Sequence, residues 1–289
     1  MAEALAAESS IEAAARAHVR KVTERSGTSF FWAMRLLEAP RRDAMFAIYA
    51  FCREVDDIAD EGGDTEAKRQ GLAEWRAEID RLYAGAPTRP TTRALLAPVA
   101  AYDLLREDFL AVIDGMEMDA VRDIQAPSLA ELELYCARVA GAVGLLSVRA
   151  FGERSESARK LALAEGKALQ LTNILRDLVE DAGRDRLYLP RELLARHGIE
   201  GREPRAVLAH PELGKACDDL AAIAEAAYAE AAGWLGRLER RKMRPAIIML
   251  EVYRRTLAAL RARGWRQLER PVGPSKLAKL WLALRYGLL

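Results

Sequence analysis

The sequence predicts an all-α fold in which a single domain, residues 1–289, forms a helical bundle around a central cavity. Nearly every segment places apolar residues at helical spacing, and short breaks containing Gly, Pro or Ser separate these segments. The only strand-like segment, RDRLYLP at 184–190, is too short to build a sheet. Hydrophobic residues make up 51% of the chain and charged residues 30%, which is enough for a large core with a charged surface. No linker or shift of composition divides the chain, so one domain is expected.

The expected helices follow one another with short connections. Short helices punctuated by Pro and Gly are expected between Pro190 and Pro211. The final segment, 275–289, is amphipathic; docking on the bundle is expected, although its composition also suits contact with a membrane surface. In chain order the longer helices are expected at 3–25, 30–37, 41–61, 65–83, two places between 92 and 121, 129–151, a segment opened by Ser155, 213–238 and 245–263.

Local signals define several helix ends. Ser29 is expected to cap the short apolar helix that begins at Phe30, and Pro40 is expected to close it. Ser128 and Glu131 have the spacing of a capping box, so the 129–151 helix is expected to begin directly after Ser128.

Two glycines, Gly141 and Gly144, lie inside the expected 129–151 helix. A glycine in a helix interior costs about 1 kcal/mol relative to alanine. The pair therefore indicates a close approach by another helix or by a ligand.

The helix over 41–61 changes character along its length. Its first half, from Ala44 to Cys52, is apolar on all sides, which is typical of a buried helix. Its second half carries a row of acids, in which Asp56 and Asp60 are four residues apart and share one helical face. Like charges so placed repel each other, and a divalent cation between them is one reason to keep them. The alternative is a charged helix end that emerges into solvent.

A second acidic row favours the cation. In QLTNILRDLVED, residues 170–181, Asn173, Asp177 and Asp181 are spaced four and four, with leucines and isoleucine on the apolar side. Each row has an arginine beside it, Arg53 in the first and Arg176 in the second. Two such patterns on long apolar helices are unlike a chance arrangement.

Together the rows suggest a chemistry. If the two helices face each other, five oxygen-bearing side chains rim one cavity whose depth is apolar. Mg²⁺ there would neutralise a diphosphate and make it a leaving group, and the arginines would grip phosphate oxygens. The apolar depth suits a long hydrocarbon tail and shields an allylic carbocation, which aromatic faces stabilise.

Other functional classes lack their signals. The net charge of +1 gives no field to attract nucleic acid. The three cysteines and three histidines are scattered without metal-ligand spacing, and sparse cysteines are typical of a reducing compartment. No apolar run is long enough to span a membrane, and the N-terminus has no signal-peptide pattern, so a cytoplasmic location is expected. Motifs for nicotinamide, nucleotide-phosphate, zinc-protease and serine-hydrolase sites are absent from the sequence.

Four segments resemble the squalene/phytoene synthase family. They are SFFWAMRLL from Ser29, AIYAFCREVDDIADE from Ala47, YCARVAGAVG from Tyr135, and QLTNILRDLVEDAGRDRLYLPRE from Gln170. The resemblance runs through nearly the whole chain to SKLAKLWLALR at its end. It implies the isoprenoid-synthase helical bundle and a head-to-head (1-1′) condensation of two prenyl diphosphates. IDGMEMDA, from Ile113, and the length look most like the bacterial members that make presqualene diphosphate for hopanoids.

The resemblance assigns roles to individual residues. It makes Asp56, Asp60, Asp177, Asp181, Tyr49 and Arg53 the catalytic set, and it departs from the family at Gly27, where relatives have a serine that Ser26 or Ser29 would replace. The implied Mg²⁺ ligands are Asp56, Asp60, Asn173, Asp177 and Asp181. The implied diphosphate contacts are Tyr49, Arg53, Gln170, Arg176, Tyr253 and Arg270. The implied tunnel wall is Tyr135, Val139, Val143 and Gly144, with Phe30 and Tyr188 near the path of the cation.

Simpler interpretations remain beside these. Tyr49 and Phe30 also fit core aromatics, Tyr253 and Arg270 a helix-surface pair, and the glycines helix packing alone. Phytoene or dehydrosqualene synthesis is the alternative product, and a non-catalytic helical scaffold is the alternative class. The expected partners are farnesyl diphosphate and, downstream, other isoprenoid enzymes, with peripheral membrane contact as an open alternative.

Overall fold

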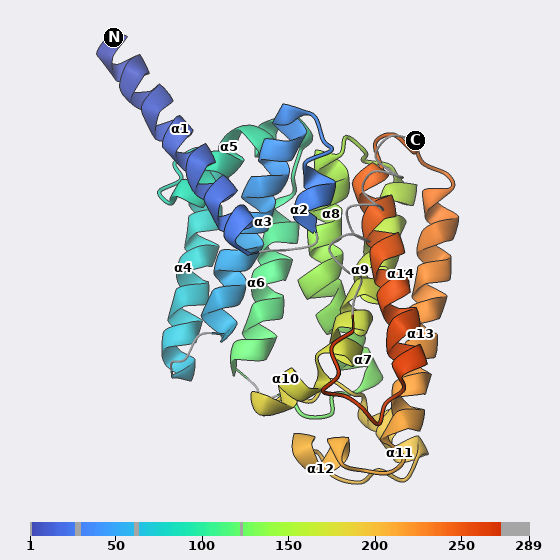
Figure 1. Ribbon diagram of the computed structural model, residues 1–289. Coiled ribbons are helices and arrows are strands. Elements are labelled where there is room, and N and C mark those ends of the chain that lie inside the picture. The colour runs from blue at the N-terminus through green and yellow to red at the C-terminus, as the bar shows by residue number, and fades with distance from the viewer. Residues whose placement is uncertain (1, 27–29, 61–63, 122–123, 273–289) are drawn as a thin grey trace.

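The structure is a computed structural model that describes residues 2–26, 30–60, 64–121 and 124–272. Helices dominate this part of the chain, as the sequence predicts (Figure 1). The elements are α1 (Ala2–Arg25), α2 (Phe30–Met34), α3 (Ala39–Asp60), α4 (Thr65–Tyr83), α5 (Pro90–Tyr102), α6 (Arg106–Val121), α7 (Leu129–Cys136), the π-helical segment η1 (Ala137–Gly141), α8 (Ala142–Ala150), α9 (Glu156–Arg176), α10 (Leu178–Gly183), α11 (Arg191–Arg196), α12 (Pro204–Leu208), α13 (Leu213–Leu235) and α14 (Arg244–Arg263).

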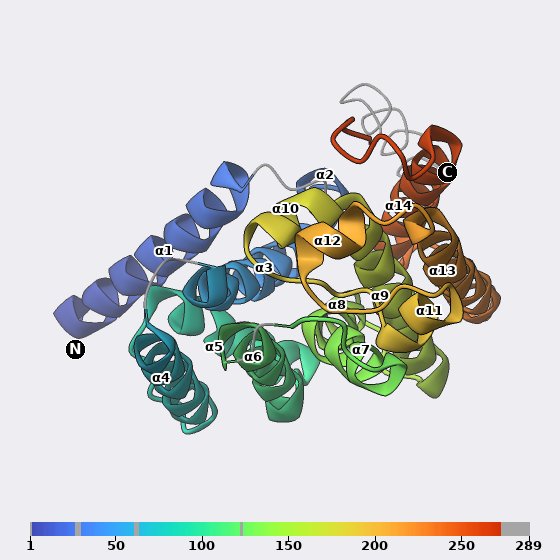
Figure 2. The same cartoon turned by 90° about the horizontal axis from the view of Figure 1, so that it is seen from below.

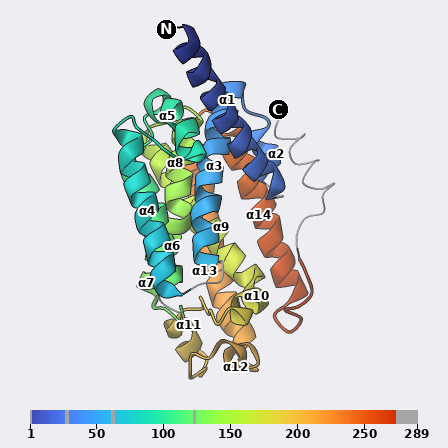
Figure 3. The same cartoon turned by 90° about the vertical axis from the view of Figure 1, so that its left-hand side faces the viewer.

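Two helices lie at the centre of the bundle and are packed on several sides. Helix α3 contacts α1, α5, α6 and α8, while α9 contacts α13, α8, η1 and α14. The long helices run roughly side by side, and the short helices α10, α11 and α12 cover one end of the bundle (Figures 1 and 3). Residues 44–52 of α3 are almost entirely buried, as their uniformly apolar composition predicts, with Phe51 and Ile48 almost without exposed surface.

Glycines allow helices to touch at the level of the backbone. A Cβ built on Gly144 of α8 would lie 2.8 Å from the carbonyl oxygen of Ala162 in α9. One built on Gly166 of α9 would lie 2.7 Å from the backbone nitrogen of Gly141. The predicted close approach at Gly141 and Gly144 is therefore confirmed, and the approaching element is helix α9.

Three local predictions were wrong. The second helix ends at Met34, and Pro40 lies in the first turn of α3, where its missing N–H leaves no bond unmade. The predicted 129–151 helix does begin with the Ser128 capping box, but the π-helical turn η1 interrupts it. The predicted continuous helix through the second acidic row breaks at Asp177, whose φ of −101° and ψ of 13° fall outside the α region.

The strand-like segment after α10 forms no sheet. Leu187 makes an isolated parallel bridge with Gln125, and the Leu187 N–H donates to the carbonyl of Ile124 across 2.6 Å. The bridge ties the segment after α10 to the connection that precedes α7. It thereby fixes the position of Tyr188, which contributes to the site described below.

Some predictions fall outside the described residues. These are the cap at Ser29, the departure at Gly27, the break at Gly62-Gly63 and the amphipathic segment 275–289. Among the helices that the structure describes, none is both long and apolar enough to cross a membrane.

Candidate active site

The first acidic row lies at the C-terminal end of α3. Arg53 forms an ion pair of 2.5 Å with Asp57, on the next turn, and lies 3.6 Å from Asp56. Burial, together with the neighbouring charge of Asp60, raises the pKa of Asp56 to about 6. This is the repulsion that the four-residue spacing of Asp56 and Asp60 predicts.

The second acidic row keeps its spacing across the helix break. The Asp177 N–H donates to the Asn173 carbonyl and the Asp181 N–H to the Asp177 carbonyl, each across 2.8 Å. Burial and the charge of Asp177 raise the pKa of Asp181 to about 7. Arg176 donates two hydrogen bonds, of 2.7 and 2.6 Å, to the carboxylate of Asp177.

Tyr253 of α14 connects to this second row through Arg176. Burial lowers the pKa of Arg176, but the hydrogen bonds and charge of Asp177 and a hydrogen bond with Tyr253 outweigh it, so the pKa is raised overall. The predicted diphosphate contacts Arg176 and Tyr253 are thus held together.

Arg186 and Asp119 connect the two rows. Arg186, in the segment after α10, donates to Asp60 Oδ1 across 2.9 Å, and Arg184 donates to Asp60 Oδ2 across 3.0 Å. The charge of Asp119, on α6, raises the pKa of both Asp56 and Asp181. The two rows therefore converge at the end of the bundle where α3, α6, α9 and α10 meet, which Figure 2 shows from below.

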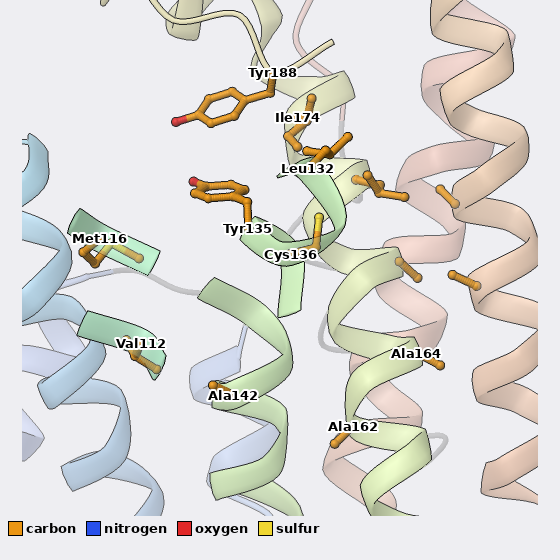
Figure 4. Packing of buried hydrophobic residues seen from close by; sticks show 14 of the residues in the cluster. Val112, Met116, Leu132, Tyr135, Cys136, Ala142, Ala162, Ala164, Ile174 and Tyr188 are labelled. Atoms are coloured by element: carbon orange, nitrogen blue, oxygen red, sulfur yellow. The ribbon is translucent and has the colours of Figure 1, made fainter. Parts of the chain in front are cut away.

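Two stacked tyrosines hold Asp119 in place. The Tyr135 hydroxyl donates to Asp119 Oδ2 across 2.7 Å, and the Tyr188 hydroxyl donates to Oδ1 across 2.6 Å. The two rings lie 5.1 Å apart with 25° between their planes, and both hydroxyls point the same way (Figure 4). Burial raises the pKa of Asp119, although the two hydroxyl donors work against this shift, and burial also raises the pKa of each tyrosine.

The sequence predictions missed Asp119, Arg184 and Arg186. A single aspartate has no partner at helical spacing, so a search for paired carboxylates does not find Asp119. Helical spacing was an available signal, because it places Asp114 and Glu117 on a different side of α6 from Asp119. In the structure, Arg76 of α4 binds Asp114 and Glu117 at 2.6 and 2.7 Å. A helical-wheel analysis of α6 would therefore have separated Asp119 from the two acids that face α4.

Interior helices supply the apolar surroundings. Tyr49, Cys52, Val139 and Val143 pack against the hydrophobic core but keep part of their accessible surface. Burial raises the pKa of the Cys52 thiol to about 12, so this side chain is removed from bulk water. Cys52 lies one turn before Asp56 on α3, so these apolar surroundings adjoin the first acidic row.

The remaining predicted residues are not all gathered at this end. Phe30 and Tyr253 pack together with Ala33, Ile248 and Val252 between α2 and α14. Gln170 accepts a long hydrogen bond of 3.5 Å from Asn173. Gly144 packs on α9, as described above. Arg270 follows α14 and lines a cavity of about 1480 Å³ with residues of α10 and the start of α13.

The acidic rows suit a hard cation. The Oδ1 atom of Asn173 is buried without a hydrogen-bond partner, and every candidate ligand offers oxygen. Burial and neighbouring carboxylates raise the pKa of Asp56 and of Asp181, and Arg53 and Arg186 offset these effects only in part. Within the described ranges no three acidic, His or Cys side chains form a closed cluster. In this structure the carboxylates of Asp57, Asp60 and Asp177 form ion pairs with arginines.

Comparisons with known proteins agree with this geometry. The squalene/phytoene synthase family profile matches residues 23–279. The presqualene diphosphate synthase of Sinorhizobium fredii is 46% identical over 279 residues, covering 96% of this chain and all of that protein. The corresponding protein of Zymomonas mobilis is 45% identical over 91% of this chain and 90% of its own length.

Solved structures show the same fold. A dehydrosqualene synthase in complex with a ligand matches 95% of this chain and 96% of its own, with a TM-score of 0.81 and 27% identity. A squalene synthase of Alicyclobacillus acidocaldarius matches 89% of this chain and 95% of its own, with a TM-score of 0.76 and 29% identity. The all-α isoprenoid-synthase fold is therefore confirmed. The chain belongs to the squalene/phytoene synthase family.

Proposed function

We propose that this protein is a prenyltransferase that condenses two farnesyl diphosphates head to head (1-1′) to presqualene diphosphate. One diphosphate and one proton are released for each product. The observation that carries the proposal is the convergence of both acidic rows on Asp119, next to an apolar interior whose partly buried residues include Tyr49, Val139 and Val143. Relatives that are 45–46% identical over most of the chain carry the name presqualene diphosphate synthase, which supports the same product.

Magnesium ions are the proposed cofactor. Asp56 and Asp60 would hold them on one side, and Asn173, Asp177 and Asp181 on the other. When bound, the ions would polarise the diphosphate and stabilise it as a leaving group. The cation would also offset the repulsion between neighbouring carboxylates that contributes to the raised pKa values of Asp56 and Asp181.

Arginines are the proposed partners of the phosphate oxygens. Arg53 and Arg176 now grip Asp57 and Asp177, through charge-assisted bonds of 2.5–2.7 Å. When Asp177 faces a cation instead, Arg176 would be free to turn to diphosphate, which matches its planar fork, and Arg53 would exchange Asp57 for the same group. Tyr253 contacts Arg176 and would orient it.

The apolar interior protects the carbocation. Water would capture an allylic cation, so the chamber must be dry, and aromatic faces stabilise the positive charge. Phe30, Tyr49, Tyr135 and Tyr188 are the aromatic residues proposed to lie along its path. The hydroxyls of Tyr135 and Tyr188 point at buried Asp119, so both rings have a fixed orientation.

One incubation tests the proposal. The purified protein with farnesyl diphosphate and Mg²⁺, and without NADPH, should release diphosphate and accumulate presqualene diphosphate. Asp56→Ala and Asp177→Ala should fold and lose this activity. If both variants were folded and fully active, the proposed site would be wrong.

Product analysis separates the alternatives. A phytoene synthase of Thermus thermophilus is 36% identical over 86% of this chain, so a C40 or dehydrosqualene product is the second candidate. Turnover of geranylgeranyl diphosphate alone would favour phytoene synthesis, and a need for NADPH would favour squalene. The proposal also places the enzyme in the cytoplasm, where downstream isoprenoid enzymes would take up the product.

A further inference from the structure

A strongly basic turn connects α13 and α14. Residues 237–244, RLERRKMR, carry five cations and one acid, although the whole chain has a net charge of only +1. This segment, the basic turn, lies at the end of the bundle opposite the acidic rows, as the courses of α3 and α14 in Figures 1 and 3 show. The basic turn and the acidic rows therefore lie at opposite ends of the bundle.

Most of the positive charge in the basic turn is uncompensated. Lys242 pairs with Glu153 at 3.2 Å and Glu239 at 3.0 Å, so these three charges largely cancel. Arg240 and Arg241 are exposed, and no ion pair is recorded for either within the described residues. Met243 is fully buried and Lys242 reaches the α8–α9 connection, so the turn is anchored to the bundle.

An aromatic ring lies beside this positive charge. Lys160 Nζ and Arg237 Cζ each lie 4.5 Å from the centre of the Trp234 ring, at the end of α13. Leu36, in the connection between α2 and α3, is 42% exposed, and α2 packs on α14 through Ala33. Tryptophan flanked by Lys and Arg is a composition found where proteins meet the lipid headgroup region.

We propose that the basic turn docks the enzyme on a bilayer that contains anionic phospholipids. The acidic mouth then faces away from the like-charged surface, and the end carrying α2 faces the lipid. This orientation rests on the proposed function, because its benefit is to keep the hydrocarbon end of the proposed chamber near a membrane that can accommodate the hydrocarbon chains of the product. The surface differs from the amphipathic segment 275–289.

Charge alone would also attract other polyanions, but two observations favour lipid. The cations are confined to one short turn and its neighbours, which is too small for the extended track that a nucleic acid needs. Trp234 is partly buried between two cations rather than presented for base stacking.

Vesicle co-sedimentation without substrate tests the proposal. The full-length protein should bind vesicles of phosphatidylcholine with phosphatidylglycerol, and high salt should release it. Arg240→Gln/Arg241→Gln should weaken this binding by about 25-fold, since each arginine near an anionic membrane contributes roughly a factor of five. The matched control is Arg202→Gln/Arg205→Gln, which removes the same charge at the opposite end and should bind as wild type does.

Three results would each overturn the inference. They are equal binding to pure phosphatidylcholine, equal loss in the two double variants, and tighter binding to a single-stranded RNA of matched charge than to the anionic vesicles. Circular dichroism and turnover of farnesyl diphosphate in detergent check that the variants are folded. Vesicle binding needs no turnover, so a protein that fails to bind vesicles would refute the docking proposal and leave the proposed function untouched. A protein that binds vesicles but is inactive would refute only the proposed function.

Discussion

Arg186 donates a hydrogen bond of 2.9 Å to Asp60, which joins the segment after α10 to the last residue of α3. Arg186 is only 12% exposed, whereas Arg184, which binds the other oxygen of the same carboxylate, is 43% exposed. Two arginines thus hold one carboxylate from environments that differ in access to water.

This difference predicts unequal effects of substitution. Arg186→Gln should lower the free energy of unfolding by about 2 kcal/mol, because it removes the buried partner of Asp60. Arg184→Gln should cost under about 1 kcal/mol, since exposed ion pairs contribute little. Urea unfolding of both variants at neutral pH measures this. Equal losses would show that burial does not set the strength of the pair.

Asp119→Asn tests the aspartate to which the two tyrosines donate. The amide still accepts a hydrogen bond but carries no charge, so both rings lose an ionic anchor and the acidic rows lose a neighbour. We expect kcat to fall about 100-fold, with a smaller change in KM. Asp114→Asn, which removes a partner of Arg76 of α4 from a different face of the same helix, should stay within about threefold of wild type. Similar losses in both variants would mean that α6 is merely sensitive to substitution.

Glu165 predicts a pH-dependent stability. It is buried between α9 and α14, its Oε1 has no hydrogen-bond partner, and burial raises its pKa to about 8. The folded state therefore binds a proton that the unfolded state has already released. The stability gained from this proton is lost as the pH rises through about 8.

The free energy of unfolding should accordingly fall by up to about 1.4 kcal/mol per pH unit between about pH 4.5 and pH 8, and this contribution should level off above pH 8. Glu165→Gln should flatten this dependence, whereas Glu66→Gln, at an exposed position in α4, should keep the wild-type slope. Urea titrations on either side of pH 8 measure the slopes. An unchanged slope in Glu165→Gln would assign the effect to other groups.

Gly144→Ala should be strongly destabilising. The new Cβ would lie 2.8 Å from the Ala162 carbonyl oxygen, a backbone atom that cannot move without displacing α9. We expect a loss of about 2–3 kcal/mol. Gly233→Ala is the matched control, because no atom lies within 4 Å of its added Cβ and α13 should gain about 0.5–1 kcal/mol from the better helix former. Thermal unfolding distinguishes the two directions.

The pattern of apolar residues was enough to predict the fold class and most of the helices. The four-residue spacing of Asp56 with Asp60, and of Asn173 with Asp177, correctly predicted which polar side chains lie one helical turn apart, because helical periodicity is local. The metal and substrate assignments remain predictions. Family resemblance, rather than periodicity, supplied the fold family and the proposed reaction.

The errors have physical reasons. The sequence predicts that Pro40 ends the short helix that begins at Phe30. Proline is equally suited to the first turn of a helix, and local sequence does not separate the two uses. The break at Asp177 and the π-helical turn at Ala137–Gly141 depend on packing against other helices, which no short window contains. Asp119, Arg184 and Arg186 meet residues more than 50 positions away, so only the tertiary structure brings them to the site, as in the bond from Tyr188 to Asp119.

The contact of Gly144 with Ala162 constrains how this enzyme could evolve toward longer substrates. Gly144 meets α9 backbone against backbone, so where this pair bounds the proposed chamber there is no side chain left to shorten. A lineage that accepts a longer isoprenoid must gain its extra length elsewhere, by trimming bulky residues such as Phe30 on α2 or Tyr49 on α3. Selection for a longer substrate should therefore leave Gly144 unchanged and act on aromatic residues such as Phe30 and Tyr49.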